Sequence, residues 1–158
     1  MSRGLLTITL IGGGLIAGYS FYSKMKKTSA ELVVIPDASL YSVNWDGITI
    51  RLDLLLKNPT KGSFSIKFPF VKLTYKNTMV GSSQIVNQDI KIPANGQSKI
   101  ESLLVNIPIL SVFSVSSSIL KSIQNKEQVK ITATMMTTID LGIATIPFEE
   151  SHEVILKK

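Results

Sequence analysis

The sequence changes character near residue 28, and this change limits what the chain can fold into more than any other feature. Residues 5–22 read LLTITLIGGGLIAGYSFY, a run of 18 residues without a formal charge. An apolar stretch of about 20 residues crosses the hydrocarbon core of a bilayer as a helix. From residue 31 onward, apolar residues instead recur at every second position, which is typical of half-buried β-strands. We therefore expect a membrane anchor with a basic flank over residues 1–27 and a β-sandwich domain over residues 28–158.

The first part has the features of a single-pass transmembrane helix. Its glycine run, residues 12–14, would weaken a helix in water but is tolerated in lipid, where unpaired backbone groups are costly. Aromatic rings gather at the end of the run, as they do at the headgroup level of membranes. The lysines that follow can contact anionic headgroups. The residues expected to form the anchor are Leu5, Leu6, Ile8, Leu10, Ile11, Leu15, Ile16, Tyr19, Phe21 and Tyr22, and those of the headgroup flank are Lys24, Lys26 and Lys27.

Several properties of this segment are left open by the sequence. A cleavable signal peptide, with a basic start and a shorter apolar core, competes with the anchor. A helix buried in the folded domain is disfavoured, because the run is apolar on every face. Gly14 and Gly18 form a GxxxG pair through which two helices could approach closely. The side of the membrane that holds the β-sandwich is also open, since a domain of this size can translocate regardless of flanking charge.

The second part is a series of short strands separated by turns. The clearest strand runs from Ile48 to Lys57, with isoleucine and leucine at the even positions from 48 to 56. The segment Asn58–Gly62 ends this strand, because proline lacks a backbone donor and glycine accepts a positive φ. About seven short strands with turn signals between them predict an antiparallel immunoglobulin- or fibronectin-III-like β-sandwich. The other expected strands are Glu31–Ile35, stopped by Pro36, then Val71–Lys76, Met79–Ser83, Gln88–Ile92, Ser98–Ile107, Val129–Met135, Ile139–Ile146 and Ser151–Leu156.

Two further segments have recognisable local chemistry. Pro93-Ala-Asn-Gly96 predicts a turn in which proline presets φ and Gly96 takes a left-handed position. After Pro108, apolar residues recur at helical spacing and predict one amphipathic helix that covers an end of the sandwich. A second membrane-contacting surface is the alternative interpretation of this helix. Its apolar face is expected to consist of Ile109, Val112, Phe113, Ile119, Leu120 and Ile123.

Composition excludes several classes of function. The chain has no cysteine, which excludes disulfides, thiolate metal sites and a cysteine nucleophile. Its net charge of +6 comes mainly from Arg3 and the three lysines before residue 28, and the rest holds 13 basic and 11 acidic residues. These later lysines form no basic stripe with interleaved aromatic residues, so we expect no nucleic-acid binding.

Residues that could support catalysis are sparse. The one histidine is His152, which we expect to be a surface residue on the last strand. Glu149 and Glu150 are the only adjacent carboxylates, and neighbours on a strand point to opposite faces. A serine-based triad would depend on His152 alone. We therefore expect no catalytic residues, no metal site, no cofactor and no small-molecule substrate, so that the protein is not an enzyme.

The middle of the chain resembles the late embryogenesis abundant (LEA) type 2 family, also known as the WHy domain. The similar segments are Leu54–Pro59 (LLLKNP), Phe70–Tyr75 (FVKLTY), Val80-Gly81, Ile92–Ser98 (IPANGQS) and Leu103–Pro108 (LLVNIP). The resemblance covers roughly residues 31–157 and rests on pattern and turn chemistry. It departs from the family at Thr60, where a further asparagine often follows the Asn-Pro element.

This resemblance implies a fold of two antiparallel sheets with one helix, a link to desiccation or other stress, and no enzymatic activity. It also implies structural roles for five residues of these segments. Asn58 is expected to end its strand by bonding nearby backbone with its side chain. The five residues are Asn58, Pro59, Gly81, Pro93 and Gly96.

Two functions are compatible with these features. The first is a membrane-anchored stress-protection or binding module, whose partners are the lipid membrane and a protein or a second copy of the chain. The alternative is a structural protein that tethers a complex or coat to a membrane, including the membrane of a virion. A short chain with a single anchor suits both.

Overall fold

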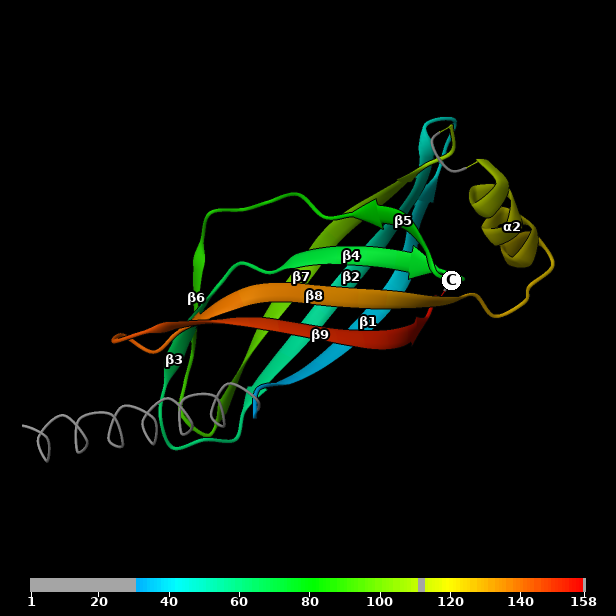
Figure 1. Ribbon diagram of the computed structural model, residues 1–158. Helices are drawn as coiled ribbons and strands as arrows, with labels where there is room; N and C mark the ends of the chain where they lie inside the picture. The colour runs from blue at the N-terminus through cyan, green and yellow to red at the C-terminus, as the bar shows by residue number, and fades with distance from the viewer. Residues whose placement is uncertain (1–30, 111–112, 158) are drawn as a thin grey trace, which may run out of the picture.

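The computed structural model describes residues 31–110 and 113–157. The predicted transmembrane helix lies outside these residues and therefore stays a prediction. The described part is mainly antiparallel β-structure with one helix, as predicted, and it holds nine strands (Figure 1). They are β1 (Val33–Val43), β2 (Gly47–Asn58), β3 (Phe64–Lys67), β4 (Phe70–Tyr75), β5 (Thr78–Ser82), β6 (Asp89–Ile92), β7 (Gly96–Pro108), β8 (Lys130–Asp140) and β9 (Thr145–Ile155), with the helix α2 (Phe113–Gln124) between β7 and β8.

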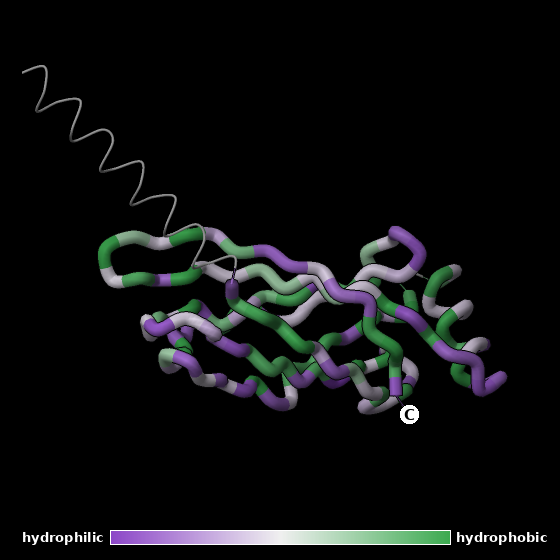
Figure 2. Tube along the Cα trace, turned by 90° about the horizontal axis from the view of Figure 1, so that it is seen from below, coloured by the Kyte–Doolittle hydropathy of each residue, from purple (hydrophilic) through white to green (hydrophobic). Residues whose placement is uncertain are grey.

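The strands form two layers that enclose the core. One layer is β1-β2-β7, and the other contains β5-β4-β8, with β9 and the short β3–β6 pair attached to β8. On one side, the layers join through the residue pair Ser82 of β5 with Asn106 of β7. On the opposite side, Leu40 of β1 donates its N–H to the carbonyl of Lys157, 2.8 Å away. The result is a β-sandwich closed by backbone contacts on both sides (Figures 1 and 2).

Strand β2 shows most directly why the alternating pattern produces this fold. The side chains at the even positions 48 to 56 are between 0% and 1% exposed, which confirms the predicted core face. Each such side chain contributes about 1.5–3 kcal/mol by leaving water. The polar residues between them face outward on the same strand. Short hydrophilic and hydrophobic stretches also follow one another along the chain elsewhere in the sandwich (Figure 2).

The predicted end of the first strand at Pro36 is wrong. Strand β1 continues through Pro36 to Val43, and Pro36 lies opposite Leu54 in the β1–β2 ladder. In the described sheet β1 has only β2 as a ladder neighbour, so it is an edge strand. A proline is tolerated there because its missing N–H can face away from the ladder.

The predicted strand Ile139–Ile146 is also wrong. Its first part is the end of β8 and its last part is the start of β9, with a tight turn between them. In that turn Gly142 has φ +85°, and Leu141 donates its N–H to the carbonyl of Ala144. Strand β3 was missed altogether, because four residues are too few to show an alternating pattern.

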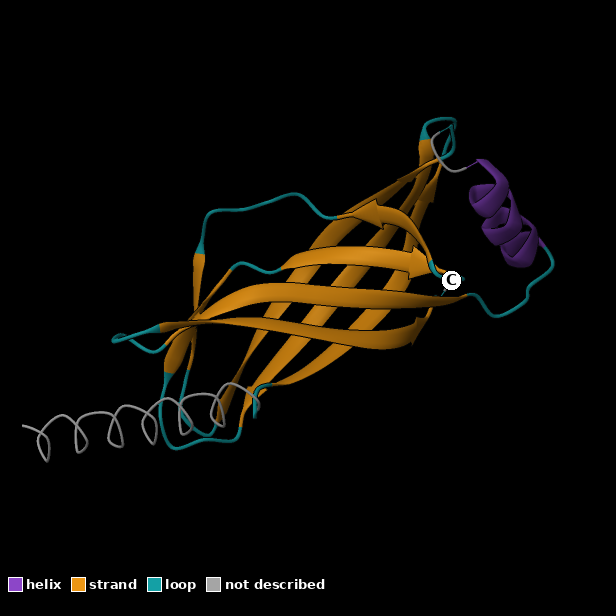
Figure 3. Cartoon of the chain, in the orientation of Figure 1, coloured by secondary structure: helices purple, strands orange, loops and turns teal. Residues whose placement is uncertain are grey.

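The predicted helix is present but begins later than expected. Pro108 still belongs to β7, and the N–H of Ile109 bonds the carbonyl of Asp46, so neither residue is part of the helix, which is described from Phe113. Ile119 is fully buried. Phe113, in contrast, is 67% exposed and does not belong to the buried face. The helix lies beside one end of the sandwich (Figure 3).

Candidate functional site

The Asn58 side chain connects two loops at one end of the sandwich. Its Nδ2 donates to the carbonyls of Gly62 at 2.8 Å and Pro93 at 3.0 Å. Its Oδ1 accepts from the N–H of Thr60 at 2.9 Å and from the Thr60 hydroxyl at 2.7 Å. Asn58 is 1% exposed, so these four bonds satisfy an amide that has almost no access to water. The backbone N–H of Asn95 also bonds the carbonyl of Thr60, which ties the same two loops together again.

The turn after β6 differs from the prediction in one respect. Asn95, with φ +48°, is the left-handed residue, and Gly96 is not. Asparagine tolerates this conformation better than most residues. Gly96 is required for a different reason, because a Cβ at this position would lie 2.5 Å from Cγ of Pro93. Pro93 and Gly96 therefore pack directly against each other across the turn.

Gly81 lies where the two layers join. A Cβ on Gly81 would come within 2.5 Å of the carbonyl oxygen of Asn106 on β7. The neighbouring Ser82 pairs with the same Asn106 in the β5–β7 ladder. Gly81 thus allows a close approach of two backbones and lies far along the strands from the Asn58 loops.

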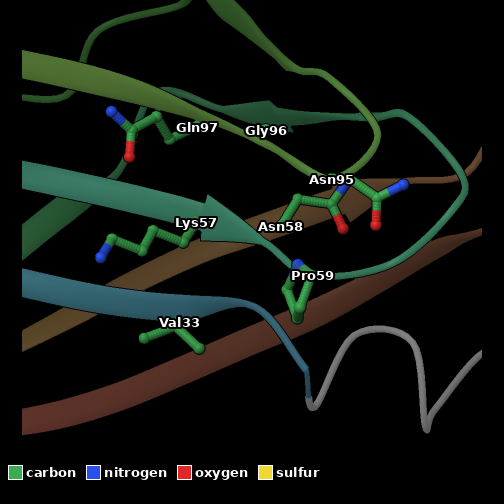
Figure 4. A pocket seen from close by; sticks show the side chains of 7 residues that line it. All are labelled: Val33, Lys57, Asn58, Pro59, Asn95, Gly96 and Gln97. Atoms are coloured by element: carbon green, nitrogen blue, oxygen red, sulfur yellow. The ribbon is translucent and has the colours of Figure 1, made fainter.

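An open hollow of about 470 Å³ lies beside the Asn58 loops. The strands β1, β2 and β7 end together there, and Pro59 packs at its rim (Figure 4). Its lining is more apolar than polar and carries one charged group, the ammonium of Lys57. The residues around it are Val33, Lys57, Asn58, Pro59, Asn95, Gly96 and Gln97. Asn58 takes part with its backbone and stem only, since its amide is fully engaged in the loops.

His152 lies on β9, as predicted, but it is only partly exposed. It alternates with exposed neighbours along β9, and its side chain is 30% exposed on the inward face. Its Nε2 lies 3.1 Å from Oε1 of Glu150, two residues earlier on the same face. Glu149 is exposed on the other face, as the strand pattern predicts. No group of three or more potential metal-ligating residues occurs within the described segments.

A polar network on the outer face of the β1-β2-β7 layer was not visible in the sequence. Asp53 accepts hydrogen bonds from the N–H of Ser102 at 2.8 Å and from Arg51 at 3.1–3.2 Å. Ser102 has φ +59° and lies at the irregularity where the β2–β7 register shifts. Partial burial alone would raise the pKa of Asp53, but the Ser102 N–H and the Arg51 guanidinium together hold this pKa below its usual value. The network stabilises a β-bulge.

The end of the sandwich opposite Asn58 carries exposed apolar residues. Trp45, in the β1–β2 turn, is 98% exposed, and Leu110, after β7, is 91% exposed. The turn that holds Trp45 is well defined, because Asn44 Oδ1 accepts from the N–H groups of Asp46 and Gly47, both at 3.0 Å. An exposed tryptophan on an ordered turn is a frequent feature of protein contact sites. No helix in the described ranges is long and apolar enough to cross a membrane, and the expected anchor and lysine flank precede these ranges.

Comparison with known proteins establishes the fold and no family. No protein-family model and no curated protein matches this chain. Among solved structures, a crystal structure of an Archaeoglobus fulgidus protein aligns with a TM-score of 0.54 at 12% identity, over 80% of this chain and 97% of its own. That similarity shows a shared fold.

Two further solved structures align less well. A protein from Arabidopsis thaliana has a TM-score of 0.47 at 19% identity, over 77% of this chain and 79% of its own. A protein named as a candidate late embryogenesis abundant protein has a TM-score of 0.32 at 19% identity, over 96% of this chain and 86% of its own. These TM-scores are too low to support a conclusion about either fold or function.

Proposed function

We propose that this chain is a membrane-tethered, non-catalytic β-sandwich of the LEA type 2 kind that acts as a stress-protection or binding module. The observation that carries the proposal is the Asn58 clamp. The two segments with the most distinctive family resemblance, Asn58-Pro59 and Pro93–Gly96, are joined by the Asn58 amide. The tether itself is proposed from the uncharged run at residues 5–22.

The chemistry of the described residues supports a binding role over a catalytic one. The amide of Asn58 is consumed by structural bonds, and the hollow beside it contains one charged group and no acid–base pair. The Glu150–His152 pair lies on the partly buried face of β9 and does not line the hollow beside Asn58. A surface that binds through shape, apolar contact and Lys57 fits this arrangement.

The tether and the protective activity need separate tests. For the tether, the full chain is expressed and the membranes that contain it are washed with alkaline carbonate. Protease protection then reports on which side of the membrane the sandwich lies. The chain is expected to stay in the membrane fraction, and its release would refute the tether. For protection, vesicles carrying the full chain are dried and rehydrated, and leakage of a trapped dye is compared with vesicles carrying an Asn58→Ala variant. If vesicles carrying the native chain leaked as much dye as protein-free vesicles, a protective role would be refuted.

The second candidate function, an assembly protein that holds a complex or coat to a membrane, is favoured by the apolar residues around Trp45. A nearly fully exposed tryptophan on a rigid turn suits a contact with another protein better than protection of a dried surface. The decisive measurement is the stoichiometry of the chain in purified particles or complexes. A fixed ratio that is lost in a Trp45→Ala variant would support assembly, and a variable ratio would exclude it.

A further inference from the structure

The position of residue 33 determines which end of the sandwich can approach a membrane. Strand β1 starts at Val33, beside the hollow at the Asn58 loops (Figure 4). The ten residues 23–32 separate Val33 from the end of the uncharged run, and fully extended they would span at most about 35 Å. Strand β2, with 12 residues, adds about 40 Å between this end and the Trp45 turn. The Asn58 side is therefore the one within reach of a tethering bilayer.

We call this region the Asn58 end, and it consists of three connections, the strand residues that border them and the start of β1. The connections are the β2–β3 loop (59–63), the β6–β7 turn (93–95) and the β8–β9 turn (141–144). The first two are joined by the Asn58 clamp. The third lies beside them, because Ser63 and Gly142 line one common hollow. All three connections lie on the same side of the sandwich, away from α2 (Figure 1).

The Asn58 end presents cationic groups that the fold leaves available. Lys57, Lys61 and Lys91 are exposed, and none has an ion-pair partner among the described residues. Of the other lysines in the described ranges, four are paired with carboxylates and four are not, namely Lys72, Lys76, Lys121 and Lys126. The carboxylates of this end are Glu31 and Asp140, and Oδ1 of Asp140 already accepts from the N–H of Gly142.

Apolar groups lie among these lysines. Ile143, in the β8–β9 turn, is 72% exposed, and Val33 and Pro59 border the hollow. A Cβ added at Gly62 would meet no other atom within 4 Å, so a side chain at this position would project into open space. Exposed lysines mixed with apolar side chains suit the boundary between headgroups and acyl chains of an anionic bilayer.

We propose that the Asn58 end rests on the anionic lipid headgroups of the membrane that holds the chain, with the Trp45 turn directed away from it. This inference rests on the proposed tether and adds to it a defined contact surface and a lipid class. Lys57, Lys61 and Lys91 supply the electrostatic attraction, and Ile143 and the rim of the hollow enter the headgroup layer. The apolar residues at the opposite end then remain free for a partner outside the bilayer.

The chain contains a single tryptophan, so two fluorescent reporters can mark the two ends. Native Trp45 reports the far end. Gly62→Trp combined with Trp45→Phe reports the Asn58 end, and Ile143→Trp in the same background is a second reporter if the first impairs folding by circular dichroism. The full-length proteins are placed in vesicles of phosphatidylcholine with or without phosphatidylserine, and quenching by brominated lipids is measured.

The Asn58-end reporter is expected to be quenched several-fold more strongly than Trp45, and more strongly when phosphatidylserine is present. A triple variant, Lys57→Glu, Lys61→Glu and Lys91→Glu, should lose the dependence on phosphatidylserine. The matched control changes three exposed lysines elsewhere by the same charge and should keep the dependence on phosphatidylserine. Its substitutions are Lys76→Glu, Lys121→Glu and Lys126→Glu.

Four results would overturn the inference. Equal quenching of both reporters would mean that the sandwich lies along the membrane, and stronger quenching of Trp45 would mean that it is inverted. Quenching of neither reporter in a chain that still resists alkaline extraction would leave the tether intact and refute the contact surface. Release of the chain by alkaline extraction would refute the tether, and the proposed contact would fall with it.

Discussion

Replacing Asn58 with alanine is the most direct test of the clamp. The change removes four hydrogen bonds, each worth roughly 0.5–1.5 kcal/mol net. The partner groups on Gly62 and Pro93 belong to exposed residues and can rebond to water, which lowers the cost. We therefore expect the free energy of unfolding to fall by about 2–4 kcal/mol. Gln97→Ala removes an exposed amide at the same end and should change the free energy of unfolding by less than about 0.5 kcal/mol.

The assay for this prediction is urea denaturation of the full chain in detergent, followed by far-UV circular dichroism. Tryptophan fluorescence is unsuitable, because Trp45 is already exposed in the folded protein. If Asn58→Ala lost no more stability than the control variant Gln97→Ala, the four bonds would not hold the two loops together. The reasoning about the clamp would then be wrong.

An aspartate at the same position gives an independent check through pH. In Asn58→Asp the second carboxylate oxygen would face the carbonyls of Gly62 and Pro93, where the native amide donates. Burial and these two acceptors should raise the pKa of the new carboxyl in the folded state. The variant should then be destabilised above this folded pKa and regain stability as the pH falls through it, because the protonated group can donate one bond. A pH-independent loss of stability would contradict this geometry.

Three further predictions concern the core, the layer junction and the bulge, all measured by the same denaturation assay. Leu52→Ala should cost about 2–5 kcal/mol because the side chain is fully buried, whereas the half-exposed Leu104→Ala should cost far less. Gly81→Ala should destabilise the fold, since the added Cβ meets the β7 backbone, while Gly62→Ala, with open space, should be nearly neutral or slightly stabilising. The lowered pKa of Asp53 stabilises the fold above the unfolded pKa, and this contribution is lost as the pH falls through the folded value. Asp53→Asn should therefore remove part of the acid sensitivity, and an unchanged pH profile would contradict the role of its hydrogen bonds.

The fold class could be predicted because the strongest sequence pattern coincides with the strongest burial. The alternating residues of β2 are also its core residues, and that strand lies between β1 and β7. The predicted strand boundaries are wrong where the position of a strand in the sheet decides whether a residue can be part of that strand. Pro36 predicts a strand end, and only the edge position of β1 explains why the strand continues through it. The boundary between β8 and β9 was misplaced because Gly142 is the only strong turn signal there.

The site shows a similar division between local and long-range information. The hydrogen bonds from Asn58 to Thr60 and Gly62 are local in sequence and follow from known turn chemistry. The bond to Pro93 spans 35 residues and could not be read from the sequence. The same holds for Asp53 and Ser102, which are 49 residues apart and meet only because the β2–β7 register shifts between them. Long-range contacts of this kind depend on register, which a single sequence does not reveal.

The length and stiffness of the sandwich make its two ends independent targets for mutation. The Asn58 end combines lysines with a hydrogen-bonded clamp, and the opposite end carries Trp45 on an Asn44-capped turn. About 40 Å of paired β2 backbone separates them, which is several Debye lengths at physiological salt. Surface charges at one end therefore cannot influence binding at the other through solution electrostatics. A substitution at Trp45 that altered lipid contact would require a change in the sandwich itself, so the two ends can be assigned separate partners by mutating one at a time.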